Sequence, residues 1–315
     1  MRVWLPAVLL LCAFSAQAVP RFHIPESLKP GAVNEIYGWD SDPLPEFRVE
    51  VRRPGGALVL SAPGFAVDRP FPAEHPGPAH WSAALAAPDA FDAAGPVSVT
   101  VLNGKTVLWQ AASAIASVTF ASEDIPLDEA MSDLRSVPDP RKDREAARIW
   151  AVYTSFHPDY WAEEGFQLPV PPKTRISARF GDQRRFLYTD GGSARDYHRG
   201  IDFAVPVGTK VAATGNGRVA FVADRELTGT TVVLEHAPGV YSVYFHLSRA
   251  LVAQDETVMA GQTIALSGAT GLVTGPHLHW EFRVDGVSVD PMPLVSDGLL
   301  DTNTVSRVIS NELNR

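Results

Sequence analysis

Apolar and polar residues alternate in short runs over the first third of the chain, which is the period-two pattern of β-strands. Three such runs cover residues 47–51, 57–60 and 97–101, and clusters of Pro, Gly and Asp separate them. Asn103-Gly104 stands between two apolar runs and predicts a hairpin with a type I′ turn, because both residues tolerate positive φ. The pattern predicts a small β-sandwich over residues 19–120.

A helical period replaces the alternation in residues 121–172. Asp139-Pro140 can cap a helix and occupy its first position. The apolar residues within 141–152 then fall on one helical face, opposite the charged ones. Residues 169–172 form a proline-rich link, which is typical of a domain boundary. We therefore expect a partly helical, proline-rich connector over 121–172.

Short apolar runs separated by glycine-containing turns return after residue 173. Asp285-Gly286 predicts a tight hairpin whose first strand starts at His277. We expect a second all-β domain over residues 173–295, a compact antiparallel sheet with long loops. A polar tail at 296–315, which can end in a helix, follows it. The fold class is therefore all-β. Further strands are expected at 210–213, 218–223, 230–235, 241–247 and 263–266.

Residues 1–18 have the three parts of a secretory signal peptide. Arg2 gives a positive start, residues 4–14 are apolar, and Ala16-Gln17-Ala18 is a small-x-small cleavage site. The single cysteine, Cys12, lies inside this segment, so we expect a mature chain without disulfides. No other apolar stretch is long enough to cross a membrane. We expect a periplasmic or secreted protein that is not transmembrane after signal cleavage.

Net charge narrows the choice of partners. The formal net charge is -9, and the chain has neither a long basic run nor a zinc-finger motif. An acidic surface repels the phosphate backbone. We therefore expect no nucleic-acid partner.

Four histidines and an aspartate form the candidate functional site in the second half of the chain. His277 and His279 lie two apart in a predicted strand, so their side chains project to the same face. His198 precedes Asp202 by four residues, and His246 stands between the two motifs. An aspartate that enters an apolar strand needs a partner, because burying an unpaired charge is costly. A metal ion is one such partner.

Asp202 has other possible roles, since it could cap a turn or pair with Arg195 or Arg199. Two histidines and one carboxylate on zinc leave a position for water, as in catalytic rather than structural sites. Spare histidines can move protons near neutral pH, because their unperturbed pKa is about 6.5. Chemistry alone leaves open which of His277 and His279 binds the metal, and whether His246 is a ligand.

Residues 175–291 closely resemble the peptidase domain of lysostaphin-type (LytM-domain) zinc metalloendopeptidases. The resemblance covers somewhat over a third of the chain. It rests on segments 179–181, 198–203, 206–211, 217–219, 244–247 and 270–281, and above all on His198-Arg199-Gly200-Ile201-Asp202-Phe203 and Pro276-His277-Leu278-His279-Trp280-Glu281.

The resemblance implies one Zn²⁺ per chain, with His198, Asp202 and His279 as its ligands. It makes His246 and His277 the catalytic histidines that handle the water and the oxyanion. The implied fold is a two-layer antiparallel β-sheet with the site in a groove. The implied substrates are peptide stems and cross-links of bacterial peptidoglycan.

Some members of this family have lost ligands and act as noncatalytic wall-binding or hydrolase-activating modules, which is the alternative function. All five site residues are present in this chain. The N-terminal β domain could recruit a cell-wall partner. The chain departs from the family's pattern in its loops, because residues 252–258 lack a common glycine, Val273 replaces a frequent serine, and residues 187–194 lengthen the loop before His198.

Overall fold

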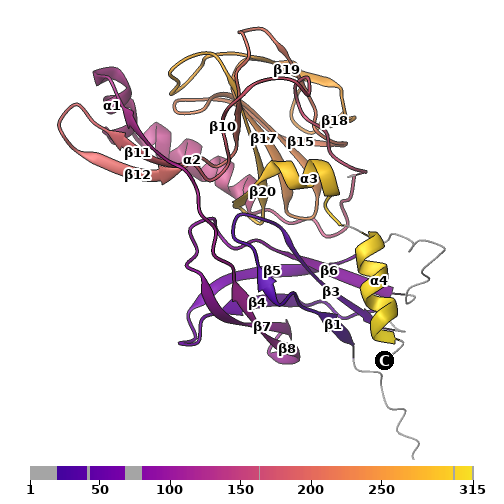
Figure 1. Cartoon of the computed structure of the whole chain (residues 1–315). Coiled ribbons are helices and arrows are strands. Elements are labelled where there is room, and N and C mark those ends of the chain that lie inside the picture. Colours follow the sequence, from indigo (N-terminus) through magenta and orange to yellow (C-terminus); the bar gives the residue numbers. More distant parts are fainter. Residues whose placement is uncertain (1–19, 41–42, 68–79, 163, 301, 314–315) are drawn as a thin grey trace, which may run out of the picture.

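The computed structural model describes residues 20–40, 43–67, 80–162, 164–300 and 302–313. The predicted signal peptide, with Cys12, lies outside the described residues. The described chain is mostly β, with two large sheets, one small sheet and four helices (Figure 1). This confirms the predicted fold class. None of the helices in the described ranges has the length and apolar character needed to span a bilayer.

The N-terminal part of the chain forms an eight-stranded sheet in the order β1-β3-β6-β5-β4-β7-β8-β2. Its core consists of inward-facing apolar residues such as Ile36, Val49 and Val99. The strands are β1 (Arg21–His23), β2 (Ser27–Leu28), β3 (Asn34–Asp40), β4 (Arg48–Arg52), β5 (Leu58–Ala66), β6 (His80–Ala86), β7 (Gly95–Asn103) and β8 (Thr106–Ile115).

Strand β5 turns this sheet into a sandwich. Its first part pairs with β4, and its last part, from Gly64 on, pairs with β6. At the corner, a Cβ added to Gly64 would lie 2.5 Å from the Phe47 ring, so a larger residue there would require that ring to move. A strand shared between two layers is a common way to make such a corner. The small sandwich was predicted from the alternating runs.

The hairpin predicted around Asn103-Gly104 is present, but its turn is displaced. Asn103 pairs with Thr106, so the turn residues are Gly104 and Lys105. Only Gly104 has a positive φ, 55°, so the type I′ prediction was wrong. A separate irregularity between Val101 and Leu102 leaves Leu108 of β8 without a register partner.

The connector contains the predicted helix and a second one. Helix α1 (Glu129–Ser136) begins after Asp128, whose side chain accepts from Met131 N. Helix α2 (Pro140–Tyr153) begins after the predicted cap Asp139, with Pro140 at its start. Strand β9 (Ser122–Pro126) was not predicted, and it pairs in parallel with β11 of the hairpin β11 (Gln183–Leu187) and β12 (Ser193–Tyr197). The connector is thereby joined to the second half of the chain.

The second half is built on an antiparallel sheet in the order β10-β13-β20-β17-β16-β15-β18. All five further runs predicted as strands are strands, and the Asp285-Gly286 turn has φ of 47° and 83°, as a type I′ hairpin requires. The strands are β10 (Ile176–Ala178), β13 (Ile201–Phe203), β14 (Lys210–Ala212), β15 (Gly217–Arg225), β16 (Gly229–Ala237), β17 (Val240–Ala250), β18 (Thr257–Val258), β19 (Thr263–Ser267), β20 (Leu278–Val284) and β21 (Val287–Val289).

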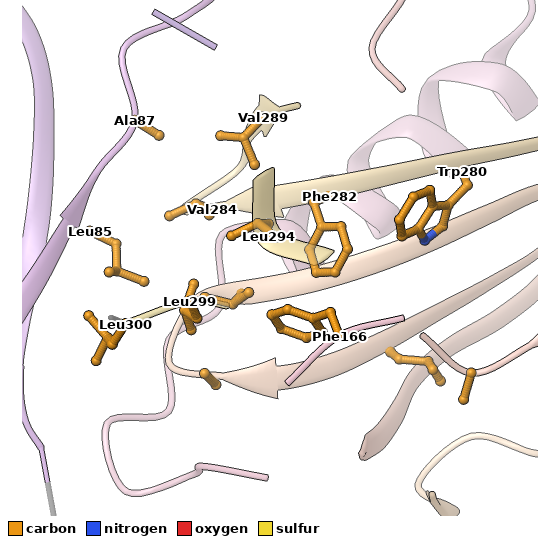
Figure 2. Packing of buried hydrophobic residues seen from close by; sticks show 14 of the residues in the cluster. Leu85, Ala87, Phe166, Trp280, Phe282, Val284, Val289, Leu294, Leu299 and Leu300 are labelled. Carbon is orange, nitrogen blue, oxygen red and sulfur yellow. The ribbon is translucent and has the colours of Figure 1, made fainter. Parts of the chain in front are cut away.

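The C-terminal segment, predicted as a polar tail that can end in a helix, does end in a helix, but its apolar face is buried. Helices α3 (Pro291–Asp297) and α4 (Thr302–Leu313) follow the sheet. Val305 and Ile309, four residues apart, are fully buried on one face of α4. Leu299 and Leu300 lie near Leu85 of β6 in the cluster of Figure 2. This core joins both halves of the chain, and α4 lies beside the N-terminal sheet (Figure 1).

Candidate metal centre

Strand pairing brings the predicted site residues together. Asp202 on β13 is the register partner of His279 on β20, and His279 is also the partner of Phe245 on β17. His198 lies just before β13, four residues from Asp202. Residues separated by about eighty positions in the sequence therefore share one face of the sheet.

Gly200 makes this approach possible through its size. A Cβ at this position would lie 2.3 Å from the carbonyl oxygen of Trp280, on the neighbouring strand. Gly200 does not have a positive φ, so this position does not need glycine for its backbone conformation. Glycine is required here for close contact between two backbones.

Three side chains converge on one point, and we call His198, Asp202 and His279 the triad. His198 Nε2 lies 3.0 Å from Asp202 Oδ1 and 2.9 Å from His279 Nδ1, while His279 Nδ1 lies 2.8 Å from Asp202 Oδ1. All three residues are buried. Two imidazole nitrogens and a carboxylate oxygen are a donor set that zinc accepts.

Hydrogen bonds from the outer ring nitrogens of His198 and His279 orient both imidazoles for metal binding. His198 Nδ1 donates to the carbonyl oxygen of Arg179 at 2.9 Å, so its Nε2 is the free nitrogen. His279 Nε2 donates to Glu281 Oε1 at 2.9 Å, so Nδ1 is the nitrogen that faces the triad and would bind a metal ion after losing its proton. Glu281 Oε2 in turn accepts from Arg283 at 2.7 Å. Such outer partners fix the tautomer of metal-binding histidines, and the residues present therefore fit a metal ion.

His246 and His277 stand beside the triad, and each uses Nδ1 for a hydrogen bond to a backbone carbonyl. His246 Nδ1 donates to Thr270 O at 2.8 Å, and His277 Nδ1 donates to Gly275 O at 2.9 Å. Their ring centroids are 4.8 Å apart, and His277 Nε2 lies 3.7 Å from Asp202 Oδ1. In both rings Nε2 is the nitrogen left for chemistry in the cavity.

The backbone at these two histidines is irregular. His246 has φ of 58°, which is unusual for a bulky residue and is typical of functional positions. His277 precedes β20 and makes an isolated bridge to Gly268, so the strand begins one residue later than predicted. Both side chains still line the same cavity as His279.

Burial and neighbouring charges shift the pKa values of the buried site residues. Burial opposes ionisation of Asp202, but hydrogen bonds from His198 and His279 hold the pKa of its carboxyl far below the usual range. Burial also works against protonated His279, yet Asp202 and Glu281 raise its pKa to about 9. Burial and the nearby His279 and His277 lower the pKa of His246 to about 3. His246 is therefore a neutral imidazole near pH 7.

A cavity of about 600 Å³ opens over the triad. One side is formed by the connector, with Met131 and Arg135 of α1 and Ile149 and Tyr153 of α2. The other side is formed by loop residues such as Leu272. Figure 1 shows α1, α2 and the β11–β12 hairpin on one flank of the second sheet. The connector therefore shapes the site, which the sequence did not reveal.

Three supporting residues, Glu281, Arg283 and Arg184, were not predicted from the sequence. Glu281 and Arg283 follow His279 at two-residue spacing on β20, so strand alternation could have placed them on the same face. Arg184 Nη2 lies 3.2 Å from Asp202 Oδ2, whereas Arg199 pairs with Asp196. The arginine beside Asp202 is thus neither of the two expected, because β11 is brought there by tertiary pairing.

A buried His-Asp-His triad on an antiparallel sheet, with two further histidines at its cavity, defines a metallopeptidase type of site. Residues 196–291 match Peptidase family M23. The predicted family resemblance is confirmed.

Named relatives agree with this assignment. Peptidoglycan DD-endopeptidase ShyA of Vibrio cholerae is 42% identical over 131 residues, which are 41% of this chain and 30% of that protein. DD-carboxypeptidase/endopeptidase Mpg of Neisseria meningitidis is 40% identical over 129 residues, 41% of this chain and 29% of that protein. The chain thus covers less than a third of the length of these two relatives. A crystal structure of a peptidase M23 from Pseudomonas aeruginosa matches 84% of this chain and 93% of that chain, with 25% identity and a TM-score of 0.57.

Proposed function

We propose that this chain is a zinc-dependent endopeptidase that hydrolyses peptide stems or cross-links of bacterial peptidoglycan in the periplasm or after secretion. The observation that carries the proposal is the set of outer hydrogen bonds at the triad. Each triad histidine already donates its outer N–H, so the inner nitrogens of both rings and Asp202 Oδ1 meet at one point. Names of relatives that act on peptidoglycan support the substrate class and a place outside the cytoplasm.

His198, Asp202 and His279 would hold one zinc ion. When bound there, zinc supplies a Lewis acid that polarises the scissile carbonyl and makes water more acidic near neutral pH. Glu281 and Arg179 O orient the two imidazoles by accepting their outer N–H groups. Without these acceptors the rings could rotate and present a protonated nitrogen.

His246 and His277 would carry the protons. Each has its Nδ1–H occupied, so Nε2 can accept a proton from the attacking water. A protonated imidazole can then stabilise the oxyanion and deliver the proton to the leaving amine. The walls of the cavity exclude part of the solvent, which strengthens these interactions.

Digestion of purified peptidoglycan by the full-length chain tests the proposal. The reaction is run with zinc, with a chelator, and with zinc restored, and released fragments are identified by mass spectrometry. Fragments that appear only with zinc are expected, and their masses identify the bond. A protein that binds zinc and peptidoglycan but releases nothing under any condition would favour the noncatalytic module.

A further inference from the structure

Arg225, at the end of β15, is the arginine of the cavity that lacks an acidic partner. Its Nη1 donates to Thr228 Oγ1 at 2.8 Å, and its Nε is buried without a hydrogen-bond partner in the described chain. No carboxylate of the described residues lies within 4.0 Å of its guanidinium. Four other arginines line the same cavity, and each pairs with an acid: Arg135 and Arg199 with Asp196, Arg184 with Asp202, and Arg283 with Glu281.

Tyr153, on α2, offers a second unused donor on the same wall. It is 4% exposed, and its hydroxyl has no partner among the described residues. Its ring lies under the guanidinium of Arg283, with Cζ 4.7 Å from the ring centroid. A buried hydroxyl without a partner is costly, so its persistence next to a cationic group indicates a ligand that accepts a hydrogen bond.

The two donors belong to one rigid wall beside the reacting groups. Glu145 of α2 accepts from the backbone N–H of Glu226 at 2.9 Å, and Arg141 pairs with the Glu226 side chain. These contacts fasten α2 to the loop that carries Arg225. On the other side of this loop, the carbonyl oxygen of Thr228 accepts from His246 N at 2.9 Å. A ligand bound at Arg225 is therefore held close to His246.

We propose that Arg225, assisted by the Tyr153 hydroxyl, binds a free carboxylate of the peptide substrate next to the scissile bond. The inference rests on the proposed peptidase function and specifies its substrate. A guanidinium presents parallel N–H donors that match the two oxygens of a carboxylate. The Arg225 guanidinium is half-buried and has no acidic partner. A bound anion would therefore supply the counter-charge that the neighbouring residues do not provide. Burial also lowers the pKa of Arg225, as expected for a cation without a counter-charge.

Two parts of a peptidoglycan peptide carry such a carboxylate: the C-terminus of a stem, and the branching diamino acid of a cross-link. Three synthetic cross-linked peptides distinguish them. The first has both carboxylates free, the second has the C-terminus amidated, and the third has the carboxylate of the diamino acid amidated. kcat/KM is measured for each with the zinc-loaded full-length protein.

For the wild-type chain we expect amidation at one of the two positions to lower kcat/KM about ten- to hundredfold, which is the effect of losing a charge-assisted hydrogen bond. Arg225→Gln should lower the rate with the free peptide by the same factor and leave the amidated peptide within about threefold. Arg225→Lys should keep part of the preference, and Tyr153→Phe should lower it about two- to tenfold. Exposed Arg249, which does not line the cavity, provides the control Arg249→Gln with the same charge change.

Equal cleavage of all three peptides by the wild-type chain would overturn the carboxylate site and leave the peptidase function intact. Cleavage of none would overturn both. A loss in Arg225→Gln that is equal for all three peptides would show a structural role and also overturn the proposal. If Arg225→Gln does not fold, the wild-type preference and Tyr153→Phe still decide the question.

Discussion

Glu281 gives the sharpest test of the metal centre, because it touches the triad without being a ligand. It is 2% exposed, accepts from His279 Nε2 at 2.9 Å and pairs with Arg283 at 2.7 Å. Glu281→Gln keeps the shape of the side chain and removes its charge. The amide can present N–H to His279, so the ring loses its fixed tautomer.

We expect Glu281→Gln to weaken zinc binding about ten- to hundredfold, or about 1.4 to 2.7 kcal/mol. The free energy of unfolding should fall by about 3 kcal/mol, since Arg283 becomes a buried cation without a counter-charge. Zinc affinity is measured by competition with a chromophoric chelator, and stability by urea unfolding of the zinc-free protein. Exposed Glu129 provides the control Glu129→Gln, which should change neither quantity.

A double variant separates the two effects. Adding Arg283→Met to Glu281→Gln removes the unpaired cation, so part of the stability should return. Zinc affinity should stay low, because His279 still lacks its acceptor. Zinc binding by Glu281→Gln within twofold of the wild type would refute the reasoning that Glu281 orients His279.

Four further predictions follow from other parts of the structure. Alanine at any triad residue should abolish zinc binding, whereas His246→Ala and His277→Ala should keep zinc and lose about 10²- to 10⁴-fold in turnover; metal analysis with kinetics tests this, and the opposite pattern would reverse the assignment. Gly200→Ala should destabilise the fold by at least about 1 to 3 kcal/mol, because its Cβ meets Trp280 O at 2.3 Å; an unchanged urea midpoint would contradict the close contact. Burial raises the pKa of Asp285 from 3.8 to about 7, so the folded chain retains a proton that the unfolded chain releases, and stability falls as pH rises from about 4 to 7. Asp285→Asn should therefore exceed the wild type by about 2 to 4 kcal/mol at pH 8 and match it near pH 4, both without metal; a difference independent of pH would count against burial of the carboxyl. Ile309→Ala should cost about 2 to 5 kcal/mol, as for a fully buried residue, and a loss below about 0.5 kcal/mol would show that α4 does not stabilise the fold.

Structural features that depend only on neighbouring residues were predictable from the sequence. Asp139 caps α2 and Asp285-Gly286 turns a hairpin, because both depend on neighbouring residues alone. The grouping of His198, Asp202 and His279 was implied by the family resemblance of their motifs, and the three side chains do lie together. The domain boundaries at residues 18, 120, 172 and 295 remain predictions.

Features that depend on distant pairing were not predictable. Arg184 reaches Asp202 because β11 is held between β9 and β12, and no short-range pattern brings those strands together. Ile309 and its neighbours carry a helical spacing, but their burial depends on a sheet more than two hundred residues earlier in the chain.

Helix α4 brings the end of the chain back to the N-terminal sheet. The polypeptide leaves the N-terminal sandwich through the connector, builds the second sheet, and returns through Leu299 and Leu300 to pack α4 in a core that includes Trp39 and Leu85 of the sandwich. The two halves are therefore tied at both ends of the second half. A single proteolytic cut in the connector should leave them associated in one particle, and hinge motion between them would first require α4 to detach.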